Sequence, residues 1–248
     1  MISPEPNFFV SFDALERSLR NLPGIDAWLP TPVAPEPDVL RAWLAPYREW
    51  ALPQVYLDFV GRYGGVSSRI PSVGVGIEPV ASVLDYRRSR EAIGDVFETP
   101  EVMLSPLNMD GDLRLIFGES DQPPRVGFFD DDDNEPVYEA DSFALYLWNA
   151  LFFFTTIYQA RFSELISLGG VPPQEVEAFN RRLPGTLRAA GFDILGADSR
   201  IVCGQREHTR FSLTVRGANV SVSMGNATAH NELARAHQQM RTVLQNNR

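Results

Sequence analysis

The stretch that decides the fold is residues 104–117, LSPLNMDGDLRLIF, in which two apolar runs are separated by Asp110 and Gly111. An Asp-Gly pair in this position is a strong signal for a β-hairpin, because both residues accept the positive φ angles of a tight turn. Leu113, Leu115 and Phe117 then alternate with Arg114 and Ile116, as in a strand with one buried face. We therefore expect an antiparallel meander over residues 101–129.

Helices are expected on both sides of this meander. Residues 53–63 begin with Pro53, which suits the first helical position, and place apolar side chains at three- and four-residue steps. Gly64 and Gly65 then predict a left-handed helix end. Further helices are expected at residues 12–22, 39–50 (capped by Asp38), 80–93 and 143–168 (capped by Asp141 and Ser142), and strands at residues 70–77 and 137–139.

The sequence GGVPP at residues 169–173 is the best candidate for a domain boundary, because glycine and proline interrupt helices and strands. It divides the chain into residues 1–168 and residues 169–248, a small α+β unit of unknown role. In that unit we expect an α-β-β-β-α order, with a helix at residues 174–190, strands at 194–203, 209–216 and 219–224, and a helix at 228–244.

Size and composition bound the class of protein. The 248 residues contain 44% hydrophobic and 22% charged residues, which is typical of a globular chain. The longest apolar stretch, residues 143–158, is interrupted by Asn149 and is shorter than the roughly 20 residues of a membrane span. Cys203 is the only cysteine, which excludes an internal disulfide. No secretory signal is visible, so we expect the chain to act in the cytoplasm without a membrane partner.

The formal charge of −10 is concentrated in the middle of the chain. Residues 85–150 carry sixteen acids and five arginines, a formal charge of −11, whereas residues 151–248 carry a charge of +4. Phosphates repel such an acidic region, so we do not expect it to bind nucleic acid. A basic partner protein would suit it, and the alternative is that these acidic loops are merely solvated.

The usual catalytic and metal-binding motifs are absent from the sequence. There is no lysine for a phosphate-binding loop and no Gly-x-Ser-x-Gly elbow. His230 and His237 share a spacing of seven residues, which alone does not make a zinc site. Residues 130–135 lack the glycine of a calcium loop, which leaves a loosely bound divalent cation as an alternative. We expect no enzyme activity, no resident metal and no cofactor.

Three segments in order resemble the SUKH superfamily, the Smi/Knr-like group, over residues 38–155. Its usual pattern is a helix with LP, aromatic residues and a closing glycine pair, then a hairpin with an Asp-Gly turn, then an SF-containing helix. Tyr63 stands where the family often has asparagine, and Phe117 lies near a position that is commonly acidic. The matching segments are Leu52-Pro53 with Tyr56, Phe59, Tyr63 and Gly64-Gly65; residues 104–117; and Pro136-Val137-Tyr138 with residues 141–147.

The resemblance implies an α+β fold, with a twisted antiparallel sheet flanked by helices and no catalytic machinery. Many bacterial members of the superfamily are similar to immunity proteins, which bind and neutralise a cognate toxin, often a nuclease. Our leading hypothesis is such a protein. One alternative is an intracellular scaffold or regulator without a toxin partner, in which the second domain or a homo-oligomer built through the aromatic helix would carry the interaction. The other is an unrecognised enzyme. The residues expected to meet a basic toxin surface are Asp110, Asp112, Glu119, Asp121, Asp130, Asp131, Asp132, Asp133 and Glu135.

Overall fold

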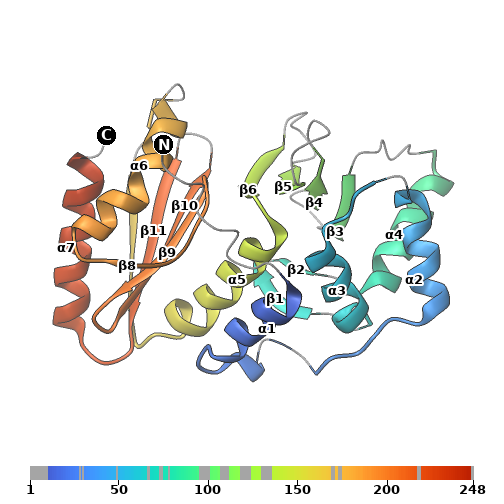
Figure 1. The fold of residues 1–248 in the computed structure, drawn as a ribbon, viewed down its shortest axis with the longest axis horizontal. Helices are drawn as coiled ribbons and strands as arrows, with labels where there is room; N and C mark the ends of the chain where they lie inside the picture. The colour runs from blue at the N-terminus through green and yellow to red at the C-terminus, as the bar shows by residue number, and fades with distance from the viewer. Residues whose placement is uncertain are drawn as a thin grey trace.

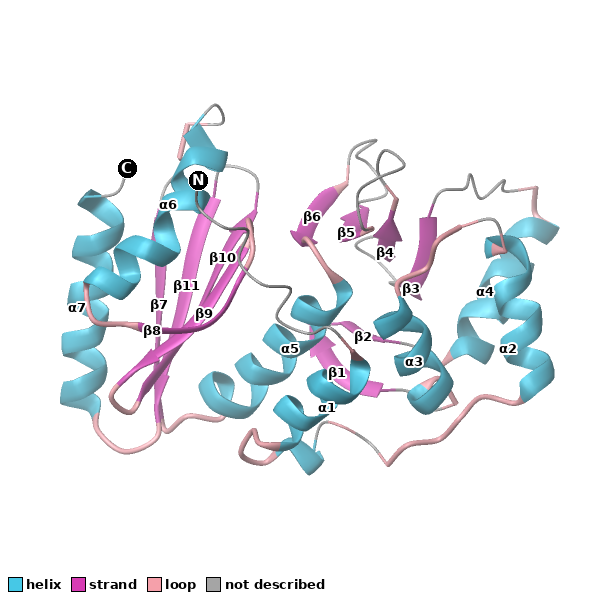
Figure 2. Cartoon of the chain, in the orientation of Figure 1, coloured by secondary structure: helices cyan, strands magenta, loops and turns pink. Residues whose placement is uncertain are grey.

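The structure is a computed structural model, and it has an α+β fold whose sheets are all antiparallel. The fold is shown in Figure 1, and Figure 2 distinguishes its helices, strands and loops. The residues that the structure describes are 11–27, 29, 31–48, 50–65, 68–72, 75–77, 79–94, 101–106, 112–117, 124–129, 136–168, 171–172, 175–216 and 219–246.

The helical elements and the strands follow one another in the order that Figure 1 labels. The helical elements are α1 (Phe12–Arg20), η1 (Ile25–Ala27), α2 (Pro37–Leu44), η2 (Ala45–Tyr47), α3 (Gln54–Tyr63), α4 (Val80–Ala92), α5 (Phe143–Phe152), η3 (Phe153–Tyr158), α6 (Val176–Ala189) and α7 (His230–Asn246). The strands are β1 (Ser68–Ser72), β2 (Val75–Ile77), β3 (Glu101–Pro106), β4 (Asp112–Ile116), β5 (Arg125–Phe129), β6 (Val137–Ala140), β7 (Phe162–Leu168), β8 (Asp193–Ala197), β9 (Ile201–Arg206), β10 (Thr209–Arg216) and β11 (Asn219–Asn226).

The predicted meander is confirmed. β3, β4, β5 and β6 pair in that order in a four-stranded sheet, here called the meander sheet. Asp112 lies opposite Pro106, so the two strands of the predicted hairpin do pair across residues 107–111. Leu113 and Leu115 are buried, as the alternation in their strand predicts. The predicted strand at residues 70–77 is instead the pair β1 and β2.

The aromatic helix α5 lies between the meander sheet and the strands that follow it (Figure 1). The Phe143 ring packs against Phe59 of α3, with 5.4 Å between ring centroids. Trp148 donates a hydrogen bond from Nε1 to Ser18 Oγ of α1 at 3.0 Å. On the other side, the Trp148 ring lies close to Gly196 of β8. The helix is therefore buried on several sides at once, which explains why it is hydrophobic all round.

The predicted helix over residues 143–168 is wrong in its second half. α5 gives way to the π-helical turn η3, and the chain then forms the strand β7. The hydroxyls of Thr155 and Thr156 donate to the carbonyl oxygens of Leu151 and Phe152, at 2.8 and 2.6 Å, where the helix changes its period. Such side-chain bonds to the preceding turn weaken the regular ladder and favour a helix end.

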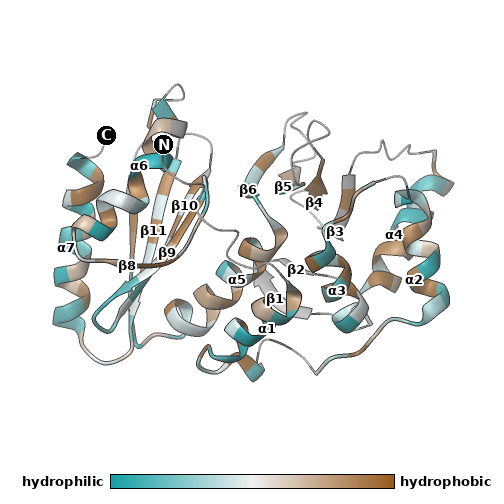
Figure 3. Ribbon diagram, in the orientation of Figure 1, coloured by the Kyte–Doolittle hydropathy of each residue, from teal (hydrophilic) through white to brown (hydrophobic). Residues whose placement is uncertain are grey.

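The strands β7, β11, β10, β9 and β8 form, in that order, a five-stranded sheet, here called the C-terminal sheet. α6 and α7 lie along one of its faces (Figure 1). In Figure 3, α7 alternates between hydrophobic and hydrophilic colours, as expected for a helix with one buried side. β7 precedes the boundary predicted at residue 169, yet its Ile166 belongs to the core under these helices.

The predicted strand at residues 194–203 is two strands, so four strands rather than three lie between α6 and α7. β8 and β9 are joined by a turn that contains neither glycine nor proline, which is why the sequence does not reveal it. Asp198 makes the turn instead, because its Oδ1 accepts hydrogen bonds from the backbone N–H groups of Arg200 and Ile201, both at 2.7 Å. A carboxylate that bonds the backbone two residues ahead stabilises a turn in place of glycine.

Three predicted helix ends differ in detail. α3 begins at Gln54 and has Pro53 as its N-cap, so Pro53 is not the first helical residue. α2 begins at Pro37 after an N-cap at Glu36, so Asp38 lies in the first turn rather than at the cap. Gly64 has φ of −70°, so the predicted left-handed end of α3 is wrong. Gly65 is needed for a different reason, since a Cβ there would lie 2.6 Å from the Ala34 carbonyl oxygen. The glycine pair therefore allows the close approach of another segment.

Candidate functional site

The nine acidic residues proposed to meet a partner can be placed only in part. Asp112 is the first residue of β4, paired with Phe129 on one side and Pro106 on the other. The other eight lie outside the residues that the structure describes.

The strands of the meander sheet nevertheless divide these candidates into two groups. Because Asp112 pairs with both Pro106 and Phe129, the strand ends that flank residues 107–111 and 130–135 lie at one end of the sheet. The strand ends that flank residues 118–123 lie at the opposite end, where Ile116 pairs with Arg125. Asp110, Asp130–Asp133 and Glu135 thus belong to the connections next to the end where Asp112 begins β4, whereas Glu119 and Asp121 belong to the connection between β4 and β5.

Arginine and tyrosine meet near the second of these ends, which sequence reasoning did not anticipate. The guanidinium carbon of Arg125 lies 3.6 Å from the centroid of the Tyr138 ring, and that of Arg200 lies 5.1 Å from the same centroid. All three side chains are partly buried. Arg125 and Tyr138 come from neighbouring strands, but Arg200 comes from the turn between β8 and β9, so only the folded chain brings it here. Cation–π contacts of this kind fix the orientation of both partners.

Two carboxylates join the meander sheet to the C-terminal sheet at the same junction. Asp198 Oδ2 accepts a hydrogen bond from the backbone N–H of Asp141 at 2.8 Å, and Asp141 Oδ2 accepts one from the N–H of Ser199 at 3.0 Å. Burial and, to a lesser extent, the charge of Asp141 raise the pKa of Asp198 to about 6, against the opposing effect of its backbone hydrogen bonds. Each carboxylate accepts a hydrogen bond from the backbone of the other segment, so the pair holds the two segments together. This pair of hydrogen bonds is here called the Asp141–Asp198 clasp.

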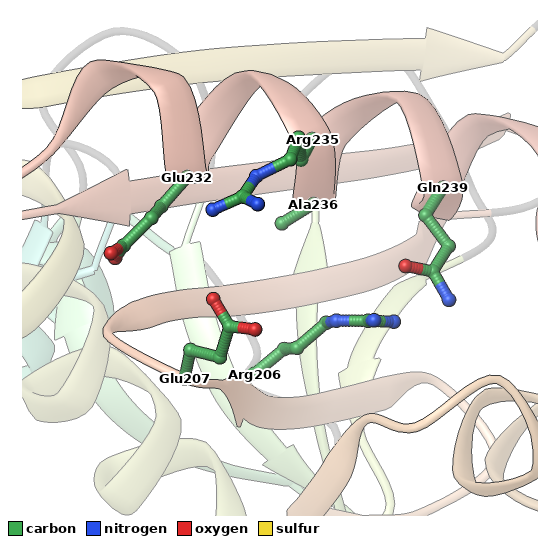
Figure 4. A pocket seen from close by; sticks show the side chains of 6 residues that line it. All are labelled: Arg206, Glu207, Glu232, Arg235, Ala236 and Gln239. Carbon is green, nitrogen blue, oxygen red and sulfur yellow. The ribbon is translucent and has the colours of Figure 1, made fainter.

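A small open pocket of about 140 Å³ lies between α7 and the turn that joins β9 to β10. Figure 4 shows Glu207 on the turn and Arg206 at the end of β9, facing side chains of α7 across the pocket. Glu207 has a positive φ of 52°, as the tight turn requires. The pocket is lined by Arg206, Glu207, Glu232, Arg235, Ala236 and Gln239.

The polar groups of this pocket are partly engaged by the protein itself. Arg206 Nη1 and Gln239 Nε2 both donate to the carbonyl oxygen of Ala190, at 2.8 and 2.6 Å. Asn226 Nδ2 donates to Glu232 Oε2 at 3.3 Å. These hydrogen bonds connect α7 to the end of α6 and to β11. The side chains that line the pocket therefore also hold the helices against the C-terminal sheet. Sequence reasoning missed the pocket because its two walls are far apart in the chain.

The histidines and the cysteine singled out in the sequence have structural neighbours. His237 Nε2 lies 3.3 Å from Glu164 Oε2, and the His230 ring packs edge-on against Phe162. Cys203 is fully buried, and burial raises the pKa of its thiol well above the ordinary value. Within the described ranges, no group of three or more histidine, cysteine, aspartate or glutamate side chains is placed to hold a metal ion.

Comparison with known proteins adds no relative. No family model matches the chain, and neither a curated protein nor a solved structure matches it significantly. In the part of the chain that the structure describes, no helix has the length and apolar character needed to cross a membrane.

Proposed function

We propose that this chain is a non-catalytic immunity protein that acts in the cytoplasm, where it binds and neutralises a cognate bacterial toxin through an acidic surface. The observation that carries the proposal is the charge of −11 between residues 85 and 150, in a chain whose total charge is −10. Toxins that degrade nucleic acid need basic surfaces, so a nuclease is the class of toxin that best complements this charge.

The meander sheet supports this proposal because its strand ends set where the acidic connections begin and end. Six of the nine candidate acids belong to the connections next to one end of the sheet, and Asp112 begins β4 at that same end. A concentration of like charge at one end of a protein speeds encounter with an oppositely charged surface by about 10- to 1000-fold and makes the rate fall with added salt. The same charge selects against acidic partners.

The order of elements supports the finer fold that the resemblance implies. α3, the β3–β4 hairpin and the junction of β6 with α5 follow one another as in the SUKH pattern. Ser142 caps α5, since its Oγ accepts a hydrogen bond from Leu145 N–H at 3.2 Å. We propose a SUKH-like domain with an N-terminal extension over residues 1–168, whose last strand β7 joins the C-terminal sheet. Residues 169–248 form the second unit, which packs against the first through α5 and β8.

The first experiment is a pulldown with the tagged chain from its native lysate, at low and high salt. We expect one basic protein to be retained, less strongly at high salt. Expressed alone, that protein should arrest growth, and co-expression of this chain should restore growth. If the retained protein is not toxic, or if its toxicity persists in the presence of this chain, the immunity function is wrong.

The acidic surface is tested separately with two charge-neutralised variants. Changing Asp130, Asp131, Asp132 and Asp133 to asparagine should slow association with the captured toxin at least tenfold at low salt and flatten its salt dependence. The matched control, Glu119→Gln with Asp121→Asn, changes acids of the connection between β4 and β5 and should have the smaller effect. Equal association rates for the wild type and the four-residue variant would show that residues 130–133 are merely solvated.

The second candidate function is an intracellular scaffold or regulator without a toxin partner. It is favoured by residues 169–248, which lie outside the SUKH resemblance and contribute four of the five strands of the C-terminal sheet. A pulldown that retains only non-toxic partners, lost when residues 169–248 are changed, would support this function in place of the first.

A further inference from the structure

We infer that β7 pairs antiparallel with β7 of a second copy, joining two C-terminal sheets into one continuous sheet. This homodimer is independent of the acidic surface and of any toxin. It uses the free edge of β7, which stands first in the strand order β7-β11-β10-β9-β8. Among the described residues, the backbone hydrogen bonds of β7 are those of its ladder with β11.

The edge of β7 has few of the features with which proteins normally prevent such pairing. Exposed edges are usually short, bulged, or interrupted by proline and charge. β7 instead pairs with β11 over seven consecutive residues without an irregularity, and its sequence FSELISL contains neither proline nor arginine. Its one charged residue, Glu164, lies on the α7 face, and this inward-pointing charge is the one protective feature of the strand. Glu164 already has a partner in the same chain, because His237 Nε2 lies 3.3 Å from its Oε2.

The other described edges of the two larger sheets do carry such protection. β8, at the far edge of the same sheet, has a register shift between Ile194 and Gly196. β6 is only four residues long, and β3 ends in Pro106 and is irregular along its length. Among these described edges, β7 is therefore the one best able to pair with a strand of another chain.

One face of β7 also exposes apolar surface at its midpoint. Ser163, Leu165 and Ser167 point away from α7, and Leu165 is 66% exposed. A second β7 paired at this edge would bring a second Leu165 beside the first and cover both side chains. Ser163 and Ser167 flank Leu165 symmetrically, so the face is the same when read in either direction.

A two-fold axis at Leu165 gives the register. Directly opposed side chains in an antiparallel pair lie on the same face, so a symmetric pair must match residues an even distance apart. Centring on Leu165 matches all seven residues of β7 and places Glu164 opposite Ile166 of the second copy. Centring on Glu164 would match fewer residues and set two carboxylates against each other, which is unfavourable. The Leu165-centred register is therefore the one we infer.

Single cysteines test this register directly. In the Leu165→Cys variant the two new thiols lie opposite each other, about 4.5–5.5 Å apart at Cα, which a disulfide spans. Mild oxidation should therefore give a covalent dimer. Ser163→Cys alone should not cross-link, because its two copies lie about 13 Å apart along the strand. A mixture of Ser163→Cys and Ser167→Cys chains should cross-link, since these residues are opposed. The wild-type chain, whose Cys203 is buried, gives the background level of cross-linking.

The mass in solution gives an independent measure. Light scattering after size-exclusion chromatography should show twice 27.7 kDa at high concentration, falling towards 27.7 kDa on dilution. Leu165→Lys should give the monomer at every concentration with unchanged circular dichroism, because two ammonium groups would face each other. The matched control Val137→Lys, at a 37% exposed position on β6, should leave the dimer intact. A monomeric wild type, or self-cross-linking of Ser163→Cys as fast as that of Leu165→Cys, would overturn the inference.

Discussion

Replacing Asn149 by alanine measures how firmly α5 holds the C-terminal sheet. Asn149 Oδ1 accepts hydrogen bonds from Ser212 Oγ of β10 and from Cys203 Sγ of β9, both at 2.8 Å. Ser212 is 4% exposed and Cys203 is 0% exposed, so in the variant both donors lose their acceptor where water does not easily replace it. An unpaired buried donor costs about 1–3 kcal/mol, and a thiol, as a weak donor, lies at the low end. We expect the free energy of unfolding to fall by about 2–4 kcal/mol.

Urea unfolding followed by circular dichroism gives this free energy directly, and in a chain of this size the melting temperature should fall by roughly 5–15 °C. The control is the double variant with Ser212→Ala. If the hydrogen bond is the cause, removing the Ser212 hydroxyl should cost less in the Asn149→Ala background than in the wild type, with a coupling of about 1 kcal/mol or more. Additive effects, or a loss below about 0.5 kcal/mol for Asn149→Ala, would refute the reasoning.

Three further predictions concern the pH dependence of stability, the close packing of a strand and the reactivity of the thiol. Because burial raises the pKa of Asp198 from 3.8 to about 6, the folded chain binds this proton more tightly than the unfolded chain. The wild type should therefore lose stability relative to Asp198→Asn as the pH rises from about 4 to about 6, in urea titrations at several pH values. Gly204→Ala should destabilise the fold by at least about 2 kcal/mol, because its Cβ would lie 2.6 Å from the Phe211 ring. Gly185→Ala, which meets nothing within 4 Å on α6, should stabilise it by up to about 1 kcal/mol in the same assay. The thiol of Cys203 should react with a disulfide reagent only in denaturant, and rapid reaction of the folded chain would contradict its burial.

Features that depend on neighbouring residues could be predicted from the sequence. The hairpin around Asp110 and the cap at Ser142 are local signals, and the paired strands and the Ser142–Leu145 hydrogen bond agree with them. The end of α5 could not be predicted in this way, because apolar residues continue through η3 without a glycine or proline. Only the alternation in FSELISL distinguishes β7 from more helix, and that pattern is short.

Features that depend on contacts between distant residues could not be predicted from the sequence. Asn149 is visible only as an interruption of an apolar helix, and its role requires Ser212, which lies 63 positions away. The Asp141–Asp198 clasp and the stack of Arg200 on Tyr138 have the same origin. Of the proposed acidic site, the structure describes only the backbone of Asp112, so its binding role stays a prediction.

The pairing of β7 with β11 has a consequence for how the chain is made. Leu168 is opposite Val220 and Phe162 is opposite Asn226, so at least about fifty further residues must be synthesised before β7 finds its neighbour in the same chain. At about 5–20 residues per second, a ribosome takes roughly 3–10 s to do so. During that interval both sides of β7 are open, and on a polysome identical nascent chains stand close together. The order of synthesis thus creates a short period in which pairing between chains competes with folding within one chain.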